Sequence, residues 1–253
     1  MVEGTVVELV ICLISIVGYL VFYKRATGGD VPHIRRIAGL DVIDEAIGRC
    51  TEQGKPVHYT FGRGEFDAGT LASFDVLSYT ARKCAETSTD IITSTARPDV
   101  HSITEEIISS AYRAAEKPDD YKPNNIRFFS DLVPAYVAGI YGIFDREKPG
   151  ANIMLGNVYG ESIMLGEAGN VLGAIQIGGA SQVIQIPFLV ATCDYTLLGD
   201  ELFAAGAYIT KEPDKVAAVV IQDLIKWSVI AATLVGTLLT TVGSDLVTRI
   251  LNY

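Results

Sequence analysis

The chain has 253 residues, enough for one large domain or two small ones, and a formal net charge of −10 at pH 7. The acidic excess lies in residues 37–215, where 25 Asp and Glu outnumber 14 Lys and Arg, whereas residues 24–36 hold four basic residues and one Asp. A short basic segment of this kind is typical of a chain that faces lipid headgroups. The acidic globular part argues against nucleic acid as a partner.

The first apolar segment runs from Leu9 to Tyr23 without a charge, and only Glu8 interrupts its extension toward the N-terminus. With that extension it approaches the roughly 20 residues needed to cross a bilayer. It lacks the basic start and the small-residue cleavage site of a secretory signal, and two basic residues follow it. Residues 1–23 are therefore predicted to form an uncleaved transmembrane helix, and residues 24–36 a basic linker.

Strand-like apolar runs alternate with helical patterns through the middle of the chain. The predicted strands are Pro56–Phe61, Thr89–Ser94, Asn125–Phe129, Ala151–Leu155 and Ala174–Gly178. The predicted helices are a leading one at Ile37–Gln53 and others near residues 70–87, 101–117, 131–146 and 158–172. This alternation predicts an α/β domain over residues 37–215, with a mostly parallel sheet covered by helices on both faces in a Rossmann-like arrangement.

Ligands of a parallel sheet bind beyond the carboxyl ends of its strands. The residues that follow the predicted strands include five candidates for binding a small anionic ligand: Arg63, Glu65, Arg97, Asp131 and Asn157. A turn from strand to helix, however, needs glycine and a Ser, Asp, Asn or Thr cap even where nothing binds. Residues of these types are therefore also expected on a rim that binds no ligand.

Catalytic and cofactor motifs are missing from the sequence. Phe61-Gly-Arg-Gly64 begins like the dinucleotide-binding pattern Gly-x-Gly-x-x-Gly, but Asp67 stands at the third glycine position. Neither the Gly-x-x-x-x-Gly-Lys-Ser/Thr phosphate loop nor the Gly-x-Ser-x-Gly nucleophile elbow occurs. The three histidines and four cysteines show no metal-binding spacing. No catalytic residue, metal or cofactor is predicted, and free cysteines suit a reducing compartment.

The stretch Ala174–Pro187, AIQIGGASQVIQIP, repeats Ile-Gln-Ile on both sides of Gly178-Gly179-Ala180-Ser181. A phosphate loop needs a helix directly after its glycines, whereas residues 182–186 alternate like the strand before them. The pattern therefore favours a hairpin, with an edge ribbon free to pair with a neighbour. Further on, Asp194 is predicted to cap a helix that contains Leu197.

The second apolar segment, Trp227–Ser244, is uncharged but only modestly apolar. With an amphipathic lead-in it covers residues 216–253 and is predicted to be a second transmembrane helix; the alternative is a buried helix of a soluble domain. Small residues recur at every fourth position, at Ser228, Ala232, Gly236 and Thr240. They would let another helix approach closely, either the first span or the same span of another subunit.

The basic residues predict the orientation in the membrane. Those at positions 24, 25, 35 and 36 follow the first span, and those at 211, 215 and 226 precede the second. Because basic residues favour the cytoplasmic side, the α/β domain is expected to face the cytoplasm from the cell (inner) membrane, with both termini outside.

Three stretches, Arg35–Gly48, Pro56–Tyr59 and Cys193–Glu201, resemble an uncharacterised prokaryotic membrane-protein family that is catalogued only as a domain of unknown function. The similarity covers the linker and the globular part of the chain. Because no activity is known for that family, the resemblance implies no catalytic residue.

These observations lead to two hypotheses of different kinds. The first is a non-enzymatic, membrane-anchored scaffold or accessory subunit, whose partners are the lipid bilayer and either its own copies, in a homo-oligomer, or other subunits of a membrane complex. The second is a membrane-tethered enzyme or sensor that binds a nucleotide or phosphorylated metabolite on the strand-end rim through Arg63 and Arg97. The double tether and the missing motifs support the first, whereas only the positions of the residues support the second.

Overall fold

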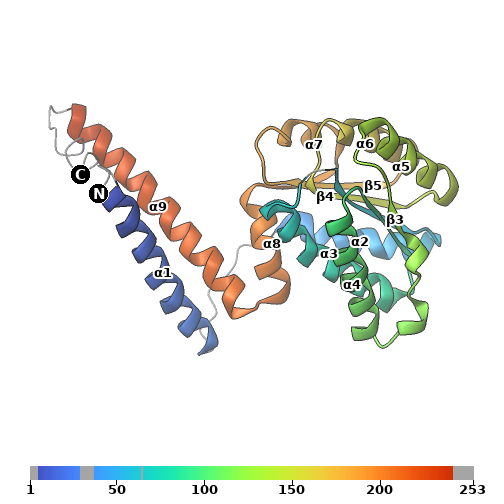
Figure 1. Cartoon of the computed structure of the whole chain (residues 1–253), viewed down its shortest axis with the longest axis horizontal. Helices are drawn as coiled ribbons and strands as arrows, with labels where there is room; N and C mark the ends of the chain where they lie inside the picture. Colours follow the sequence, from blue (N-terminus) through green and yellow to red (C-terminus); the bar gives the residue numbers. More distant parts are fainter. Residues whose placement is uncertain (1–4, 29–36, 64, 242–253) are drawn as a thin grey trace. The chain divides into compact units, whose positions relative to one another are not determined.

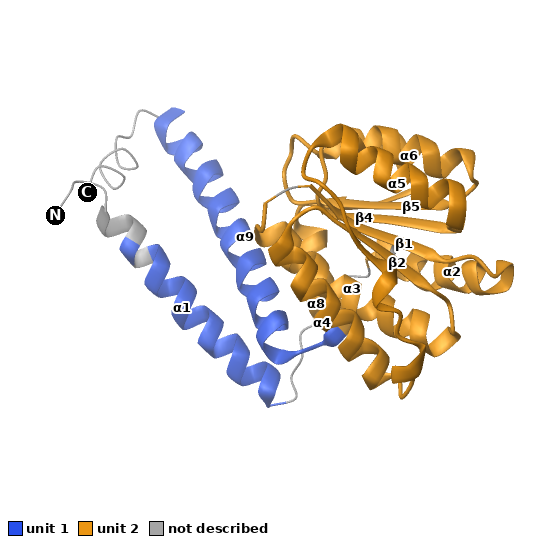
Figure 2. Ribbon diagram, turned by 45° about the vertical axis from the view of Figure 1, so that its right-hand side comes forward, with its two compact units in different colours: residues 1–35, 210–253 blue, residues 36–209 orange. Residues whose placement is uncertain are grey.

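The computed structural model describes residues 5–28, 37–63 and 65–241. The chain divides into two compact units, one formed by residues 1–35 and 210–253 and the other by residues 36–209 (Figure 2). In its described part, the first unit consists of two long helices. The second, called the α/β unit below, contains the sheet.

The described part of the α/β unit contains a six-stranded sheet in which all strands are parallel (Figure 1). The strands are β1 (Val57–Gly62), β2 (Ile91–Thr95), β3 (Ile126–Phe128), β4 (Ala151–Asn157), β5 (Ile175–Ala180) and β6 (Tyr195–Leu198). Their order is β3-β2-β1-β4-β5-β6, as in a Rossmann fold. The predicted parallel α/β fold is confirmed, and the order reverses between β1 and β4.

Helices cover both faces of the sheet, and Figures 1 and 2 show the two layers. One face carries α2 (Ala38–Gln53), α3 (Ala68–Thr87), α4 (Pro98–Ala114) and α8 (Asp200–Thr210). The other carries α5 (Val133–Glu147), α6 (Glu161–Val171) and α7 (Ile186–Thr192). Two short 3-10 helices, η1 (Pro118–Asp120) and η2 (Pro123–Asn125), precede β3. Because side chains alternate along a strand, Ile153 lies in the first core and Met154 in the second.

A row of buried polar side chains crosses the sheet on the face covered by α5, α6 and α7. His58 of β1 bonds Ser94 of β2 through Nε2 at 2.8 Å and Asn152 of β4 through Nδ1 at 2.7 Å. Asn152 in turn donates to Gln176 of β5 at 2.7 Å. The pairs lie at or near the same register of adjacent strands, so the row links four strands of the sheet.

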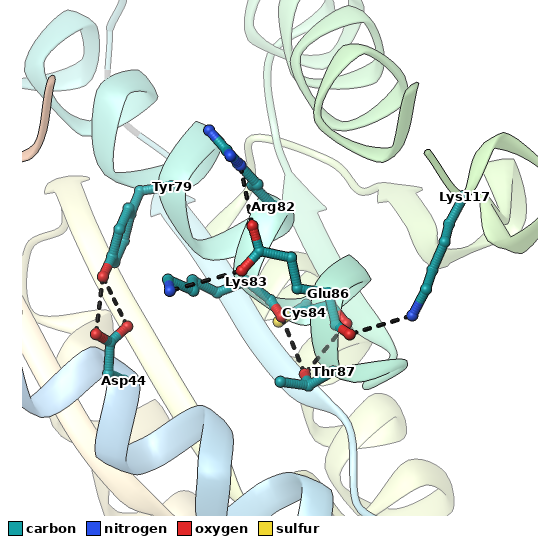
Figure 3. Close-up of polar contacts among 8 residues, drawn as sticks. All are labelled: Asp44, Tyr79, Arg82, Lys83, Cys84, Glu86, Thr87 and Lys117. Atoms are coloured by element: carbon teal, nitrogen blue, oxygen red, sulfur yellow. Dashed lines mark hydrogen bonds and ion pairs between the residues drawn. The ribbon is translucent and has the colours of Figure 1, made fainter. Parts of the chain in front are cut away.

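Polar contacts also hold the helices on the opposite face (Figure 3). The Tyr79 hydroxyl of α3 donates to both carboxylate oxygens of Asp44 in α2, at 2.7 and 2.8 Å. At the end of α3, the Lys117 ammonium donates to the carbonyl oxygens of Ala85 and Glu86 at 2.9 and 3.1 Å. These carbonyls lie at a helix C-terminus, where a cation is favoured electrostatically; the Ala85 oxygen also accepts from the Ser88 N–H at 3.2 Å.

The hairpin predicted in the stretch Ala174–Pro187 is wrong. Gly178 and Gly179 lie inside β5, which pairs with β4 on one side and β6 on the other, so β5 is not an edge. Turns and bends follow, and α7 begins at Ile186. The glycines serve close packing, because a Cβ at Gly178 would lie 2.6 Å from Cys193 Sγ and one at Gly179 would lie 2.6 Å from Leu155 Cδ2.

The helix predicted after Asp194 is also wrong at its start. Residues Tyr195–Leu198 form the edge strand β6, and α8 begins only at Asp200. Asp194 caps no helix; its Oδ2 accepts a hydrogen bond of 2.8 Å from the backbone N–H of Gln176 in β5. A strand of four residues has too few positions to show its alternation in the sequence, and here its pairing with β5 determines its conformation.

The first unit contains α1 (Thr5–Thr27) and α9 (Pro213–Thr241), which run side by side in opposite directions (Figures 1 and 2). They pack closely where Gly18 of α1 meets the side chain of Ile221. Within the described residues, α9 is the helix that is long and apolar enough, by length and composition, to span a membrane. The N-terminal span therefore stays a prediction. The last residues of the predicted second span, from 242 on, lie outside the described part of the chain.

Candidate functional site at the carboxyl edge of the sheet

The candidate site lies where β1 and β4 end side by side, at the point where the strand order reverses. A Rossmann-like sheet binds its ligands in the crevice at this place. Gly62, at the end of β1, has a φ of +77°, and a Cβ on it would collide with the backbone of Asn157 at the end of β4. Glycine at this position therefore allows the two strand ends to approach each other closely.

The Asp67 carboxylate occupies the start of α3. Its Oδ1 accepts from the Thr70 backbone N–H at 2.9 Å, and its Oδ2 accepts from the Asn157 and Gln182 side-chain amides at 3.3 and 3.4 Å. In a dinucleotide-binding protein, the free N–H groups at this helix start hold a phosphate. Here an internal carboxylate takes that place.

The loop after β5 closes the same crevice from the other side. A Cβ on Gly69 in the first turn of α3 would lie 2.6 Å from Ser181 Oγ. Gln185 donates to Asn157 Oδ1, and the other amide atom of Gln185, Oε1, is buried and has no hydrogen-bond partner among the described residues. Side chains from the end of β4 and from the segments after β1 and β5 thus meet in front of the α3 helix start.

Arg63 forms a second cluster beside the first. Its NH1 donates to the backbone carbonyl of Asp131 at 2.7 Å, and its Nε lies 3.3 Å from Glu161 Oε1. The Glu161 side chain is 2% exposed. The alignment of Nε and Oε1 does not satisfy hydrogen-bond geometry, so the two form an ion pair by distance alone. Beneath them, burial raises the pKa of Tyr136, whose hydroxyl contacts Thr60.

Arg97 lies on the same edge, after β2, and is partly exposed. It pairs with Asp99 at 3.3 Å, and the hydrogen bond from this arginine lowers the pKa of the Asp99 carboxyl. The Asp99 carboxylate also raises the pKa of Arg97, with smaller contributions from Glu65 and Asp131. The charges of Glu65 and Asp131 therefore act on Arg97, but its strongest interaction is with Asp99, two residues further along the chain.

A depression of about 660 Å³ opens next to these groups, at the ends of β2 and β3. It is lined by Ala96, Pro98, Phe128, Phe129, Ser130, Asp131 and Ala135. The lining is mostly apolar and aromatic, and Asp131 joins it to the Arg63 cluster. A depression of this volume is large enough to hold a small molecule.

The five predicted site residues share this edge of the sheet, but they do not converge on one point. Arg63 contacts Asp131, and Asn157 lies 3.5 Å from the Glu65 carbonyl, in each case through a backbone oxygen. The carboxylates of Glu65 and Asp131 belong to exposed residues. Acidic side chains outnumber the two arginines on this edge, so binding of an anionic ligand here would depend on Arg63 and Arg97.

Sequence reasoning missed the residues that close the crevice. Asp67 left one signal, since it stands where a third glycine would be, but Glu161, Gln182 and Gln185 belong to no motif. In the part of the chain that the structure covers, no three His, Cys, Asp or Glu side chains come together in a group that could hold a metal ion. Two hydroxyl–histidine pairs occur among the described residues: Ser94 with His58 at 2.8 Å, which is buried, and Thr95 with His101 at 2.9 Å, which is partly buried at the end of β2.

The second predicted set of site residues lies on α9. Gly236 is buried, whereas Ser228, Ala232 and Thr240 are exposed. Ser228 and Thr240 donate their hydroxyl protons to carbonyl oxygens of their own helix, at 2.7 and 2.9 Å. Within the first unit, then, these small residues do not form one continuous buried contact, and their role in helix packing stays a prediction.

The fold and the edge described above define a class: a Rossmann-like α/β protein that also carries a helix long and apolar enough to span a membrane. The chain belongs to the family described as "Domain of unknown function (DUF6754)", whose model matches residues 2–251. The resemblance to a family of unknown function is thereby confirmed. No curated protein and no solved structure matches the chain significantly.

Proposed function

We propose that the protein is a membrane-anchored, non-enzymatic scaffold or accessory subunit, in which α1 and α9 cross the bilayer and the α/β unit organises an oligomer or a larger membrane complex. The observation that carries the proposal is the apolar surface of the two helices. Large apolar side chains are exposed along both of them, including Ile14 and Leu20 of α1 and Trp227 and Leu234 of α9. Water would disfavour such a surface, whereas a lipid bilayer would cover it.

The closed crevice supports the non-enzymatic part of the proposal. Where a related fold would hold a cofactor phosphate, the Asp67 carboxylate accepts from the Thr70 N–H at the start of α3 and from the Asn157 and Gln182 amides. A phosphate there would have to displace this carboxylate or lie beside its negative charge. The α/β unit then acts through its surfaces more readily than through a bound nucleotide.

The proposed location is the inner membrane, with the α/β unit in the cytoplasm. The support is the basic residues next to both apolar helices, among them Lys24 and Arg25 at the end of α1 and Lys226 before Trp227. Tyr19, Tyr23 and Trp227 provide aromatic side chains of the kind that lie at the headgroup level.

Membrane fractionation with matched variants tests the anchoring. The native chain should stay in the membrane pellet after alkaline carbonate extraction. Leu234→Asp places a charge in the exposed face of α9, makes insertion less favourable by about 3 kcal/mol, and should lower the pelleted fraction. Val171→Asp is the control, because Val171 is 82% exposed on the α/β unit and its change should leave pelleting intact. Recovery of the native chain in the supernatant would contradict the proposal.

A second candidate function is binding of a small ligand on the rim. It is favoured by one observation: the buried Arg63–Glu161 ion pair, whose Nε and Oε1 have no hydrogen-bond partner among the described residues, is joined through Arg63 to Asp131, which lines the depression. Nucleotides and phosphorylated metabolites should then raise the melting temperature of the native chain. Arg63→Ala and Arg97→Ala should each abolish the increase, and a flat response over the whole panel would rule this candidate out.

A further inference from the structure

A second cavity, of about 350 Å³, lies at the edge of the sheet opposite to the candidate site, where β5 and β6 begin. Pockets of this size hold small ligands in many proteins. The residues that line it all belong to the α/β unit: Val42, Glu45, Arg49, Asn170, Gly173, Ala174, Ile175, Asp194 and Tyr195. It is called the amino-edge pocket below.

Helix α2 provides one negative and one positive side chain. Glu45 and Arg49 stand four residues apart, so both lie on the side of α2 that lines the pocket. Both residues are exposed, and neither side chain forms a salt bridge or a hydrogen bond within the part of the chain that the structure covers. The Glu45 carboxylate and the Arg49 guanidinium are therefore available to a ligand.

Asp194 provides a second carboxylate, at the start of β6. Its Oδ2 accepts from the Gln176 N–H at 2.8 Å, and its own N–H donates to the Gln176 carbonyl at 3.0 Å. These two bonds to β5 fix the position of the carboxylate. Oδ1 forms no hydrogen bond with any other described residue, so its lone pairs are left for a donor in the pocket.

The C-terminal end of α6 adds a partial negative charge. Asn170 lies in the last turn of this helix, and Gly173 follows it with a φ of +69°; both line the pocket. The carbonyl end of a helix favours a cation. Two carboxylates and a helix C-terminus thus surround a single guanidinium.

The remaining walls are apolar. Val42 and Ile175 are partly buried, and the Tyr195 side chain is 40% exposed at the mouth of the pocket. Such groups can cover the methylene chain of a ligand, and the tyrosine ring can also attract a cation. The pocket therefore combines charged groups of both signs with a surface for a short aliphatic chain.

We infer that the amino-edge pocket binds a basic amino acid, a ligand with two cationic groups and one carboxylate. The ligand carboxylate pairs with Arg49, and its cationic groups pair with Glu45 and Asp194, so that each charge meets one of opposite sign. A phosphate would meet two carboxylates, and a diamine would leave Arg49 without a partner. This inference goes beyond the scaffold role and depends on neither the membrane anchor nor the rim.

Titration calorimetry on the native chain in detergent tests the ligand class, with L-lysine as the probe. Lysine should bind, whereas two analogues should bind at least about tenfold more weakly, because each lacks one charge-assisted contact. Cadaverine lacks the carboxylate, and norleucine lacks the side-chain ammonium. Absence of lysine binding would overturn the inference. Equal affinities for lysine and cadaverine would assign the pocket to diamines and would also overturn it.

Variants of the lining residues test the position of the site. Arg49→Gln should weaken lysine binding about tenfold and leave cadaverine binding unchanged, because only lysine has a carboxylate. Glu45→Gln and Asp194→Asn should weaken the binding of both ligands, and the asparagine keeps an oxygen for the Gln176 N–H. All three side chains are exposed, so we expect the variants to fold, and their melting curves without ligand check this.

Glu52→Gln is the matched control. Glu52 is exposed on the same helix and carries the same charge, but it does not line the pocket. Because salt screens charges at a distance, its removal should change lysine affinity by less than about twofold. A loss equal to that of Glu45→Gln would indicate general attraction to an acidic surface. Lysine binding that survives all three lining variants would place the site elsewhere, and either result would overturn the inference.

Discussion

The hydrogen-bond partners of the buried His58 determine which group donates and which accepts in each of its contacts. Asn152 donates its amide to Gln176, so its Oδ1 is left to accept from His58 Nδ1, and His58 Nε2 accepts from the Ser94 hydroxyl. The neutral imidazole with the proton on Nδ1 satisfies both contacts. Burial, assisted by the charge of Arg127, lowers the pKa of His58 to about 4.

Because His58 is buried and neutral in the folded state, we expect the free energy of unfolding to depend on pH. The folded state holds His58 neutral, whereas the unfolded chain protonates it near pH 6.5. Its contribution is therefore complete above about pH 6.5 and is lost progressively as the pH falls toward 4, by about 3 kcal/mol in all. Unfolding of the native chain in detergent should be compared with that of His58→Gln between pH 7 and 4.5.

The variant should be less stable at pH 7, because an amide cannot reproduce both contacts, and its stability should fall less steeply on acidification. The carboxylates titrate in both proteins, so the difference between the two slopes reports His58. Identical slopes would show that His58 is not the buried neutral group described here.

At the scale of elements, β5 shows how packing selects glycine. A Cβ at Gly179 would lie 2.6 Å from Leu155 Cδ2 and 3.0 Å from the backbone oxygen of Leu197, which cannot move without shifting β6. The two Ile-Gln-Ile copies therefore have different conformations: Ile175–Ile177 alternates in β5, whereas Ile184 and Gln185 lie in the turn before α7, which begins at Ile186.

Gly179→Ala should lower the free energy of unfolding by about 1–3 kcal/mol, as expected for overpacking in a closed core. Gly48→Ala is the matched control: Gly48 lies within α2, and a Cβ there meets nothing within 4 Å. Alanine favours a helix over glycine, so this second change should stabilise the protein by about 0.5–1 kcal/mol. Denaturant unfolding measures both, and effects of equal sign would contradict the packing described for β5.

At the scale of the whole molecule, the first and last helices of the α/β unit lie next to each other. The Tyr208 hydroxyl near its end donates to Asp41 near its start at 3.1 Å. The two segments that continue into the other unit therefore leave from neighbouring points. Attachment of both ends at neighbouring points suits the proposed scaffold.

The sequence by itself determined the elements whose periodicity repeats over enough residues. Five strands and the helices between them were predictable, because alternation of apolar and polar residues reports a strand or a helix face locally. The long apolar segments were equally visible. The predicted rim residues do follow their strands, since the end of a strand is a local property.

Only the tertiary structure decided the features that depend on contacts between distant segments. β6 is too short to be recognised without its pairing to β5, and Asp67 closes the crevice only because Asn157 reaches it from the end of β4 and Gln182 from the loop after β5. The contact of Gly18 with Ile221 likewise joins residues more than 200 positions apart in sequence. Local periodicity predicts an element, whereas the groups that an element meets are determined by the packing of the whole chain.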